Sequence, residues 1–203
     1  MRNKLFFYYS NMNFYDFIRK LFYFIIIKLF SFHILRKVKS IYYFKTNLIT
    51  LGTNIKIHGL PFNINIGRNA TFYDNCIFEF GSNSIFTVGT NVLLSYGVLV
   101  SCNIKIHIGN DVQIGEYTSI RDTTHTYTDT TKPMKYSQDV SNEVKIGNDV
   151  WIGRGCIIMP GTVIGNGVIV GANSLVRGVL EDYGIYAGSP IRFIKSRILS
   201  DRD

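Results

Sequence analysis

Cysteine is scarce in this sequence and is never closely paired. The 203 residues include three cysteines, Cys76, Cys102 and Cys156, and no C-x-x-C motif occurs. Few, widely spaced cysteines without a C-x-x-C pair disfavour both a disulfide framework and a zinc site. Reduced thiols in the cytoplasm are the simplest interpretation of the pattern.

Long apolar runs and dense charge are lacking as well. The chain contains no charge-free apolar stretch of about 18 residues and no signal-peptide cleavage site, which disfavours a simple membrane span and secretion. Charged residues make up 18% of the chain and hydrophobic residues 46%. That composition is far from that of a disordered protein, so one sizeable folded domain with an appendage is expected.

Positive charge gathers at the two ends of the chain. The formal net charge is +8, and residues 1–45 hold nine basic residues against one acidic residue, Asp16. The C-terminal stretch adds Arg192, Lys195, Arg197 and Arg202. No recognition-helix, RNP or zinc-finger pattern accompanies this charge, so nucleic acid is not an expected partner. Lipid headgroups at the first end and cofactor phosphates at the second fit the charge better.

Within the basic, aromatic N-terminal segment 1–45, residues 14–45 have the composition of a helix. Lys28 interrupts the apolar run, which disfavours a membrane span. Such a segment either packs on the protein and its neighbouring subunits or lies in a membrane interface, with Arg36, Lys37 and Lys39 at the headgroups. Both alternatives stay open. The second would place the protein peripherally at the inner face of the cell membrane.

A repeat of six residues dominates the rest of the chain. One aliphatic residue recurs at each step in Ile146, Ile152, Ile158, Ile164, Val170 and Val176. Shorter rows with the same step begin at Ile66, Val88 and Ile108. Such a period predicts a parallel β-helix, in which three hexapeptides close a triangular coil of 18 residues. A β-sandwich, the alternative, does not explain the constant phase.

The repeat also predicts which residues stack and where the domain ends. Ile146 is expected over Ile164 and Ile152 over Val170, with their side chains inside the coil. The fold class is therefore all-β, with residues 46–190 as the β-helix domain. After the last coil, residues 191–203 are expected to form a basic tail with a short helix.

One large interruption breaks the period between Ile108 and Ile146. These residues are 38 positions apart, which is one coil of 18 plus about 20 inserted residues. The excess is the polar segment 122–143, which contains His125. A long loop on a rigid repeat is a usual place for binding and catalytic groups. Smaller offsets near Phe80–Val88 and Cys102–Ile108 predict bulges or short outgrowths.

Four segments carry a resemblance to a known family. They are Thr124–Tyr127, Val144–Gly153, Pro160–Ser174 with its Val170-Gly171-Ala172 step, and Ala187–Pro190 followed by Lys195. In this order they resemble the hexapeptide-repeat acyltransferases, and within them the branch that acetylates sugars of bacterial surface polysaccharides. The resemblance implies a left-handed β-helix, a homotrimer with active sites between subunits, and acetyl-CoA as co-substrate without a metal.

The resemblance places His125 at the position of the family's base. A sugar hydroxyl attacks a thioester poorly until its proton is removed, and imidazole, with an unperturbed pKa of about 6.5, accepts protons near neutrality. His33, His58 and His107 fit structural or solvated roles better. Asp122 and Glu116 are the nearby candidates for orienting the ring of His125.

The resemblance also implies contacts to both substrates. Trp151 is expected to form a wall of the acceptor pocket or a cover over the thioester, with subunit packing as the structural alternative. Further acceptor contacts are expected from Ser95, Asn103, Tyr127 and Asp129. Coenzyme A is expected along Gly115, Gly153, Arg154 and Ala172, with its phosphates at Arg177, Arg192 and Lys195. Turn geometry explains the two glycines and the alanine equally well. Asn103 stands where sugar-acetylating members often carry an acid, which leaves the acceptor's identity open.

The expected function is an O-acetyltransferase that acts on a sugar hydroxyl of a surface polysaccharide or its precursor. Alternatives are an N-acetyltransferase or small-molecule acetyltransferase on the same fold, and a non-catalytic trimeric scaffold. A third class is a γ-carbonic-anhydrase-like enzyme, which needs three histidines that converge on zinc. His107 and His125 are 18 residues apart and could stack, but no His-x-x-x-x-His pair accompanies them.

Overall fold

The computed structural model describes residues 18, 22, 34–46, 48–59 and 61–198. The chain forms two compact units, residues 1–39 and residues 40–203. Residues 34–44 are α-helical, as are positions 18 and 22, so the predicted N-terminal helix is confirmed there. The rest of segment 14–45 lies outside the described residues. Within the described part of the chain, no helix is both long enough and apolar enough to cross a bilayer.

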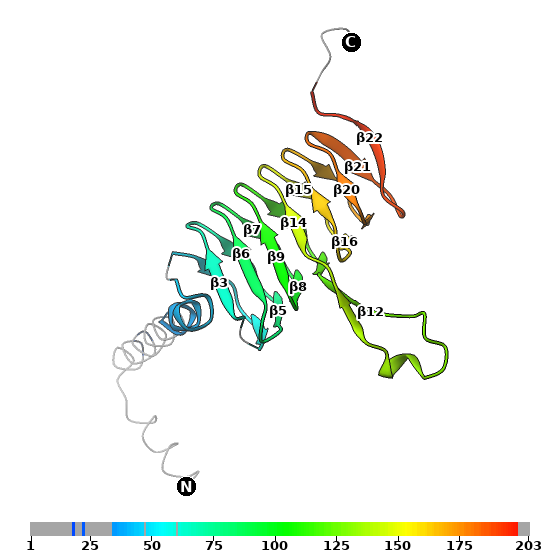
Figure 1. The fold of residues 1–203 in the computed structure, drawn as a ribbon. Helices are drawn as coiled ribbons and strands as arrows, with labels where there is room; N and C mark the ends of the chain where they lie inside the picture. Colours follow the sequence, from blue (N-terminus) through cyan, green and yellow to red (C-terminus); the bar gives the residue numbers. More distant parts are fainter. Residues whose placement is uncertain (1–17, 19–21, 23–33, 47, 60, 199–203) are drawn as a thin grey trace. The chain divides into compact units, whose positions relative to one another are not determined.

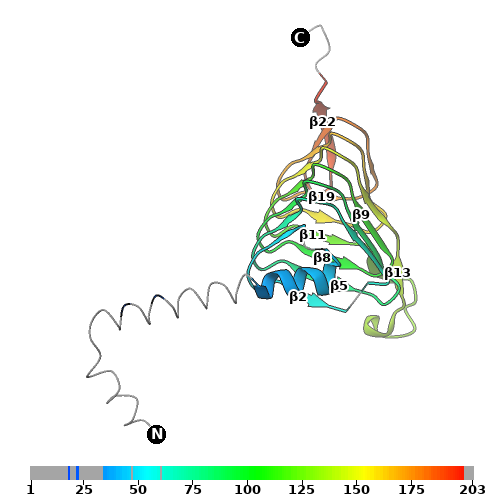
Figure 2. The same cartoon turned by 90° about the vertical axis from the view of Figure 1, so that its left-hand side faces the viewer.

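The second unit is a triangular parallel β-solenoid (Figures 1 and 2). Sheet A contains β1 (Thr50–Leu51), β4 (Thr71–Phe72), β7 (Leu93–Leu94), β10 (Gln113–Ile114), β15 (Trp151–Ile152), β18 (Ile169–Val170), β21 (Gly184–Ala187) and β22 (Arg192–Ser196). Sheet B contains β2 (Lys56–His58), β5 (Ile77–Phe80), β8 (Leu99–Cys102), β11 (Ser119–Arg121), β16 (Ile157–Ile158) and β19 (Leu175–Val176). Sheet C contains β3 (Asn63–Ile66), β6 (Ile85–Val88), β9 (Lys105–Ile108), β14 (Val144–Ile146), β17 (Val163–Ile164) and β20 (Val179–Leu180). Six coils therefore precede β21, and the predicted parallel β-helix is confirmed.

The strand registers confirm the predicted stacking. Ile146 pairs with Ile164, and Ile152 pairs with Val170. The row that begins at Ile108 stacks directly on the row that begins at Ile146. Aliphatic and phenylalanine side chains of all three sheets fill the solenoid as one buried core. Stacking buries the apolar inner face that a single coil would leave exposed.

The second and third coils are wider than the later ones because their B strands, β5 and β8, carry one more inward side chain. Val88 pairs with Ile108 and Phe78 with Val100, so both pairs are further apart in sequence than Ile146 and Ile164. Phe80 and Cys102 are buried at the ends of β5 and β8, where the short later B strands have no counterpart. The offsets from the six-residue period near Phe80–Val88 and Cys102–Ile108 therefore arise from longer B strands and from the turns that lead to sheet C.

All three cysteines are free and buried in this core. Burial raises the pKa of Cys76 to about 11. Burial, with the Asp122 carboxylate nearby, raises the pKa of Cys102 to about 12. These thiols are therefore protonated near neutral pH, and they act as small apolar side chains in the packing.

The inserted segment 122–143 is a hairpin that projects from the solenoid (Figure 1). Its strands β12 (Thr123–His125) and β13 (Asp139–Ser141) pair antiparallel. A short 3-10 helix, η1 (Met134–Tyr136), lies in the connection between them. The hairpin leaves sheet B after β11 and returns to sheet C at β14. The predicted excursion loop is therefore confirmed, with strand structure that its polar sequence did not indicate.

The predicted C-terminal helix is wrong. Residues Arg192–Ser196 form β22, which pairs antiparallel with β21 at the end of sheet A. The solenoid's last strand would otherwise leave its backbone N–H and C=O groups unpaired along one edge. Phe193 adds an edge-to-face contact with Tyr186 at a centroid distance of 5.4 Å. A helix over these residues would satisfy neither requirement.

Candidate active site

The hairpin joins His125 to a carboxylate that sequence reasoning missed. His125 on β12 lies directly opposite Asp139 on β13 in the antiparallel register. Nδ1 of His125 is 2.6 Å from Oδ1 of Asp139. Both side chains are more than half exposed, 66% for His125 and 53% for Asp139. The pair is therefore reachable from outside the chain.

This geometry determines which nitrogen of His125 can accept a proton. A carboxylate accepts hydrogen bonds, so Nδ1 carries the hydrogen that it donates to Asp139. The lone pair of the neutral ring is then on Nε2. Nε2 can take a proton from a hydroxyl while Asp139 holds the ring in place and stabilises the imidazolium. The arrangement suits a general base.

Asp122 does not orient His125, contrary to the sequence-based suggestion. Its fully buried carboxylate accepts hydrogen bonds from the backbone N–H groups of Asn103, Ile104 and Lys105, at 2.8 Å each. It also accepts one from the Thr123 hydroxyl. Asp122 therefore ties the root of the hairpin to the turn of the preceding coil.

Asn103 belongs to the same root. Its side-chain amide donates to the Ser141 hydroxyl at 3.1 Å. The Thr123 and Ser141 hydroxyls are 2.7 Å apart across the two hairpin strands. Lys105 also pairs with Glu143 at 2.8 Å, and its ammonium lowers the pKa of that carboxyl. These contacts make the root of the hairpin rigid, which fixes where β12 carries His125.

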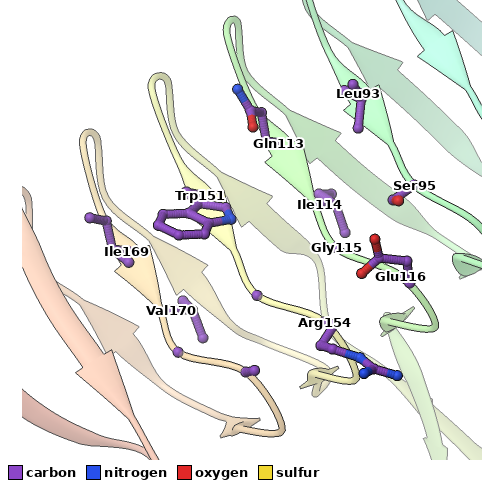
Figure 3. Close-up of a pocket in the computed structure, with 13 residues that line it drawn as sticks. Leu93, Ser95, Gln113, Ile114, Gly115, Glu116, Trp151, Arg154, Ile169 and Val170 are labelled. Carbon is purple, nitrogen blue, oxygen red and sulfur yellow. The ribbon is translucent and has the colours of Figure 1, made fainter.

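A groove of about 500 Å³ lies on the outer face of sheet A and along its edge with sheet B (Figure 3). Leu93, Gln113, Trp151 and Ile169 follow one another as register partners on four successive strands. Trp151 is 57% exposed and stands over the groove. The groove is lined by Leu93, Ser95, Gln113, Ile114, Gly115, Glu116, Trp151, Gly153, Arg154, Ile169, Val170, Gly171 and Ala172.

Along the edge between sheets A and B, a small residue follows each inward-facing aliphatic residue of sheet A, because successive coils lie close together there. A Cβ on Gly115 would lie 2.5 Å from the backbone nitrogen of Arg154. A Cβ on Gly153 would lie 2.6 Å from the backbone nitrogen of Ala172. The glycines are therefore required for stacking, whatever else they contact. They also leave backbone accessible along the floor of the groove.

The predicted site residues fall on two different edges of the triangular solenoid. We name the edge between sheets A and B, with the groove, the A–B edge. Six predicted residues line its groove: Ser95, Gly115, Trp151, Gly153, Arg154 and Ala172. The edge between sheets B and C is the B–C edge, from which the hairpin projects. It carries the other predicted group: Asn103, His125, Tyr127, Asp129 and Arg177.

Four charged residues named in the sequence analysis lie in the hairpin loop, on β22 and in the groove: Asp129, Arg192, Lys195 and Glu116. Asp129 accepts a hydrogen bond from the Thr131 backbone N–H at 3.0 Å, and the Thr131 and Lys132 hydrogen bonds lower its pKa. Arg192 and Lys195 lie on β22, two strands beyond β18 in sheet A. Glu116, offered as a partner of His125, lines the groove instead.

Within the described residues, no member of the hairpin lines the groove. The six-residue period alone did not show which of the predicted residues lie on the same edge, although the resemblance implied active sites between subunits. Asp139 was missed for a related reason. Its pairing with His125 depends on the register of the hairpin, and that register has no signature in a polar loop.

His107 does not stack with His125. It lies in register with Thr87 and Lys145, and its Nδ1 is 2.7 Å from the Thr87 hydroxyl. Partial burial and the charges of Lys145 and Lys105 lower the pKa of His107. Among the residues that the structure describes, no group of three or more His, Cys, Asp or Glu side chains is placed to hold a metal ion.

Comparison with known proteins connects this geometry to a chemistry. Residues 143–178 match the family model for bacterial transferase hexapeptide repeats. A curated relative from Mycobacterium tuberculosis (strain ATCC 25618 / H37Rv), described as a probable acetyltransferase, is 30% identical over 166 residues. The match covers 81% of this chain, and the chain spans about half of the relative, 55% of its length.

Solved structures show the same architecture with bound ligands. A variant of AntD, an N-acyltransferase from Bacillus cereus in complex with dTDP and coenzyme A, aligns with a TM-score of 0.63 and 27% identity. The alignment covers 79% of this chain and 88% of AntD. A galactoside acetyltransferase in complex with coenzyme A aligns with a TM-score of 0.53 and 26% identity, covering 62% of this chain and 64% of that enzyme.

Proposed function

We propose that this chain is an acyl-CoA-dependent acyltransferase of the hexapeptide-repeat family that moves an acetyl group to a sugar hydroxyl, with His125 as general base. The observation that carries the proposal is the 2.6 Å contact between His125 Nδ1 and Asp139 Oδ1. A hydroxyl acceptor needs a base because it attacks a thioester poorly while it keeps its proton. An imidazole whose Nδ1 is held by Asp139 and whose Nε2 is left to accept a proton supplies that base.

In the reaction, Nε2 of His125 accepts the hydroxyl proton as the oxygen attacks the thioester carbonyl carbon. Asp139 stabilises the imidazolium that forms. When the bond from carbon to sulfur breaks, His125 donates the proton to the departing thiolate. The ring ends the cycle neutral, and one proton has moved from the acceptor to coenzyme A.

The groove on the A–B edge supports coenzyme A as the acyl donor. Gly115, Gly153 and Ala172 line it with little or no side chain, so an extended pantetheine can approach the backbone there. The N–H groups of the two glycines bond to Ile152 and Val170, which leaves backbone carbonyl groups as the acceptors for pantetheine amides. Trp151 offers an apolar wall that limits hydrolysis beside the thioester. Sheet A continues two strands past the groove, roughly 10 Å by ordinary strand spacing. Arg192 and Lys195 stand there for the phosphates.

The base and the groove can form one active site if the B–C edge of one subunit contacts the A–B edge of another. One chain keeps the base on its B–C edge and the groove on its A–B edge. We infer a homotrimer in which the hairpin of one subunit meets the groove of the next, a heterologous contact that closes into a ring. Tyr127, Asp129, Asn103 and Arg177 would then reach the site from the subunit that supplies His125, with Arg177 toward the phosphates.

The acceptor we propose is a sugar of a bacterial surface polysaccharide or its precursor. Ser95 and Glu116 in the groove offer hydrogen-bond partners to sugar hydroxyls. A galactoside acetyltransferase with the same architecture is consistent with a sugar hydroxyl as acceptor. The His125–Asp139 pair favours the hydroxyl, since an unprotonated amine needs less help from a base.

A second candidate is N-acylation of an amino sugar carried on a nucleotide. AntD, an N-acyltransferase, aligns over most of both chains, and one of its structures contains dTDP-4-amino-4,6-dideoxyglucose. The half-buried Glu116 carboxylate in the groove would suit an amino group in the acceptor. The two candidates differ in product, because mild alkali removes an O-acetyl ester and leaves an N-acetyl amide intact.

The test is acetyl-CoA turnover, measured as free thiol release with hydroxyl-bearing glycans and amino-sugar nucleotides as acceptors. His125→Ala should lower acceptor-dependent turnover by about 10²–10⁴-fold. Asp139→Asn should lower kcat at least about tenfold with little change in the KM for acetyl-CoA, because it disturbs ring orientation and not the groove. His58→Ala, an exposed histidine on β2, is the matched control and should match the wild type.

Equal turnover by His125→Ala and the wild type would remove His125 from the mechanism. An alkali-stable product would replace the hydroxyl acceptor with an amine. Acetyl-CoA that binds but is never turned over with any acceptor would favour the non-catalytic scaffold.

A further inference from the structure

The helix over residues 34–44 has two opposite faces. Ser40 and Phe44 are buried and Tyr43 is half-buried. The Phe44 ring packs edge-on against Phe72 at 5.4 Å and against Phe78 at 5.3 Å. These contacts attach the end of the helix to the first coils of the core, where it covers apolar side chains that a bare solenoid end would expose.

The opposite face of the same helix is apolar and exposed. It carries Ile34, Leu35, Val38, Ile41 and Tyr42, each 44–66% exposed. Helical geometry alone puts Leu35, Val38 and Tyr42 on one stripe, since they are three and four residues apart. The stripe is centred opposite Ser40 and Phe44 at 100° per residue. A water-facing surface helix normally has polar residues at these positions.

Basic residues border this apolar stripe. Lys37 lies at one margin of the stripe and Lys39 at the other, and exposed Lys45 follows the end of the helix. The sequence before the helix, positions 1–33, adds five basic residues and one acid, Asp16. An apolar stripe with cations along its margins complements a surface that is apolar below and anionic above. A protein partner of that form would need exposed acids around an apolar groove.

We propose that the helix over residues 34–44 docks this face on an anionic lipid bilayer. Leu35, Val38, Ile41 and Tyr42 enter the boundary between headgroups and acyl chains, while Lys37 and Lys45 pair with anionic headgroups. The solenoid, held to the opposite face through Phe44, is then kept at the membrane surface. This inference does not depend on acyl transfer.

The experiment is co-sedimentation of the full chain with vesicles of phosphatidylcholine alone or with about 30% phosphatidylserine. The wild type should bind the anionic vesicles and bind less as salt rises. Leu35→Gln, Val38→Gln and Ile41→Gln together should weaken binding by roughly tenfold or more, because they remove buried apolar area at the interface. Lys37→Glu should weaken it by several fold on anionic vesicles only.

Matched controls lie elsewhere on the surface. Ile157→Thr with Val179→Thr removes exposed apolar side chains from sheets B and C, and Lys135→Glu reverses a charge in the hairpin loop. Both should bind vesicles like the wild type. Circular dichroism and thermal unfolding of every variant separate lost binding from lost folding.

Three outcomes would overturn the proposal. One is a wild type that ignores anionic vesicles, and another is a folded triple variant that binds them as well as the wild type. The third is a triple variant whose subunit number falls in light scattering while its vesicle binding is kept. That result would assign the stripe to contacts between copies of the chain.

Discussion

His125 and Asp139 differ in how much of their role the sequence indicated. The insertion between two rows of a strict repeat marked the segment that contains His125, and the family resemblance suggested this histidine as a base. Its partner was not predictable. Asp139 is one of several acids near the insertion, and only the cross-strand register selects it. Asp122, nearer in sequence, is used by the backbone of the preceding coil.

His107 leads to a prediction about pH at the same scale. Its pKa is lowered from the ordinary value of 6.5 by burial, by Lys145 and by Lys105. When the pH is below this ordinary pKa, His107 is protonated in the unfolded chain but stays neutral in the folded chain until the pH reaches its lowered pKa. The free energy of unfolding should therefore fall as pH drops from about 6.5 toward the lowered folded value. Urea unfolding from about pH 7.5 to pH 5 measures the slope.

His107→Gln should flatten that part of the slope, because glutamine does not titrate and can still reach the Thr87 hydroxyl. His58→Gln, at an exposed position, should keep the wild-type slope. Identical slopes for wild type and His107→Gln would contradict the argument.

At the scale of elements, the hairpin leaves the solenoid where the coils become narrow. β5 and β8 end on the inward side chains of Phe80 and Cys102, and Asp122 is the next residue in that series. A carboxylate in this position cannot extend the apolar stack. It accepts hydrogen bonds from backbone N–H groups of the turn in the preceding coil, and β12 begins at the next residue. The coils therefore become narrower at the same residue, Asp122, at which the insertion begins.

Asp122→Asn should destabilise the protein by about 2–4 kcal/mol, since an amide would turn an N–H₂ group toward backbone donors inside the core. Thermal or urea unfolding measures the loss, and hydrogen exchange should increase first in the hairpin. Asp111→Asn is the matched control, because Asp111 is an exposed turn residue with positive φ, a conformation that asparagine tolerates. A stable Asp122→Asn protein with an unchanged hairpin would refute this role.

At the scale of the whole molecule, the proposed base and the proposed coenzyme A groove lie on two different edges of one chain. If neighbouring subunits join them, two inactive variants should complement each other. His125→Ala damages only the hairpin, and Ala172→Trp blocks only the groove. Mixed trimers of the two should recover about one quarter of wild-type activity, because half of the grooves and half of the hairpins are intact and each site needs one of each.

Each variant alone should be trimeric in light scattering and inactive. A site contained within one chain predicts no recovery on mixing, because every chain then carries one defect. Monomers in solution would remove the subunit arrangement and leave the His125–Asp139 chemistry to be tested separately.

The solenoid, its inward residues and the place of the insertion could all be predicted from the sequence. The reason is that a six-residue period repeats the same local geometry, so each inward side chain meets its counterpart one coil later. Six residues that the family resemblance suggested, Ser95, Gly115, Trp151, Gly153, Arg154 and Ala172, lie together in the groove. Family resemblance supplied their roles, which a period alone does not contain.

The partner of His125 and the strand at the C-terminus emerged only from the folded chain. Each depends on pairing between segments that share no period. The hairpin register joins His125 to Asp139 across an irregular loop. β22 forms because β21 presents an unpaired edge, and a local sequence does not contain that edge. The position of a residue relative to the edges of the solenoid depends on the number of residues in each coil. That number changes where Phe80, Cys102 and Asp122 are buried at the ends of the B strands.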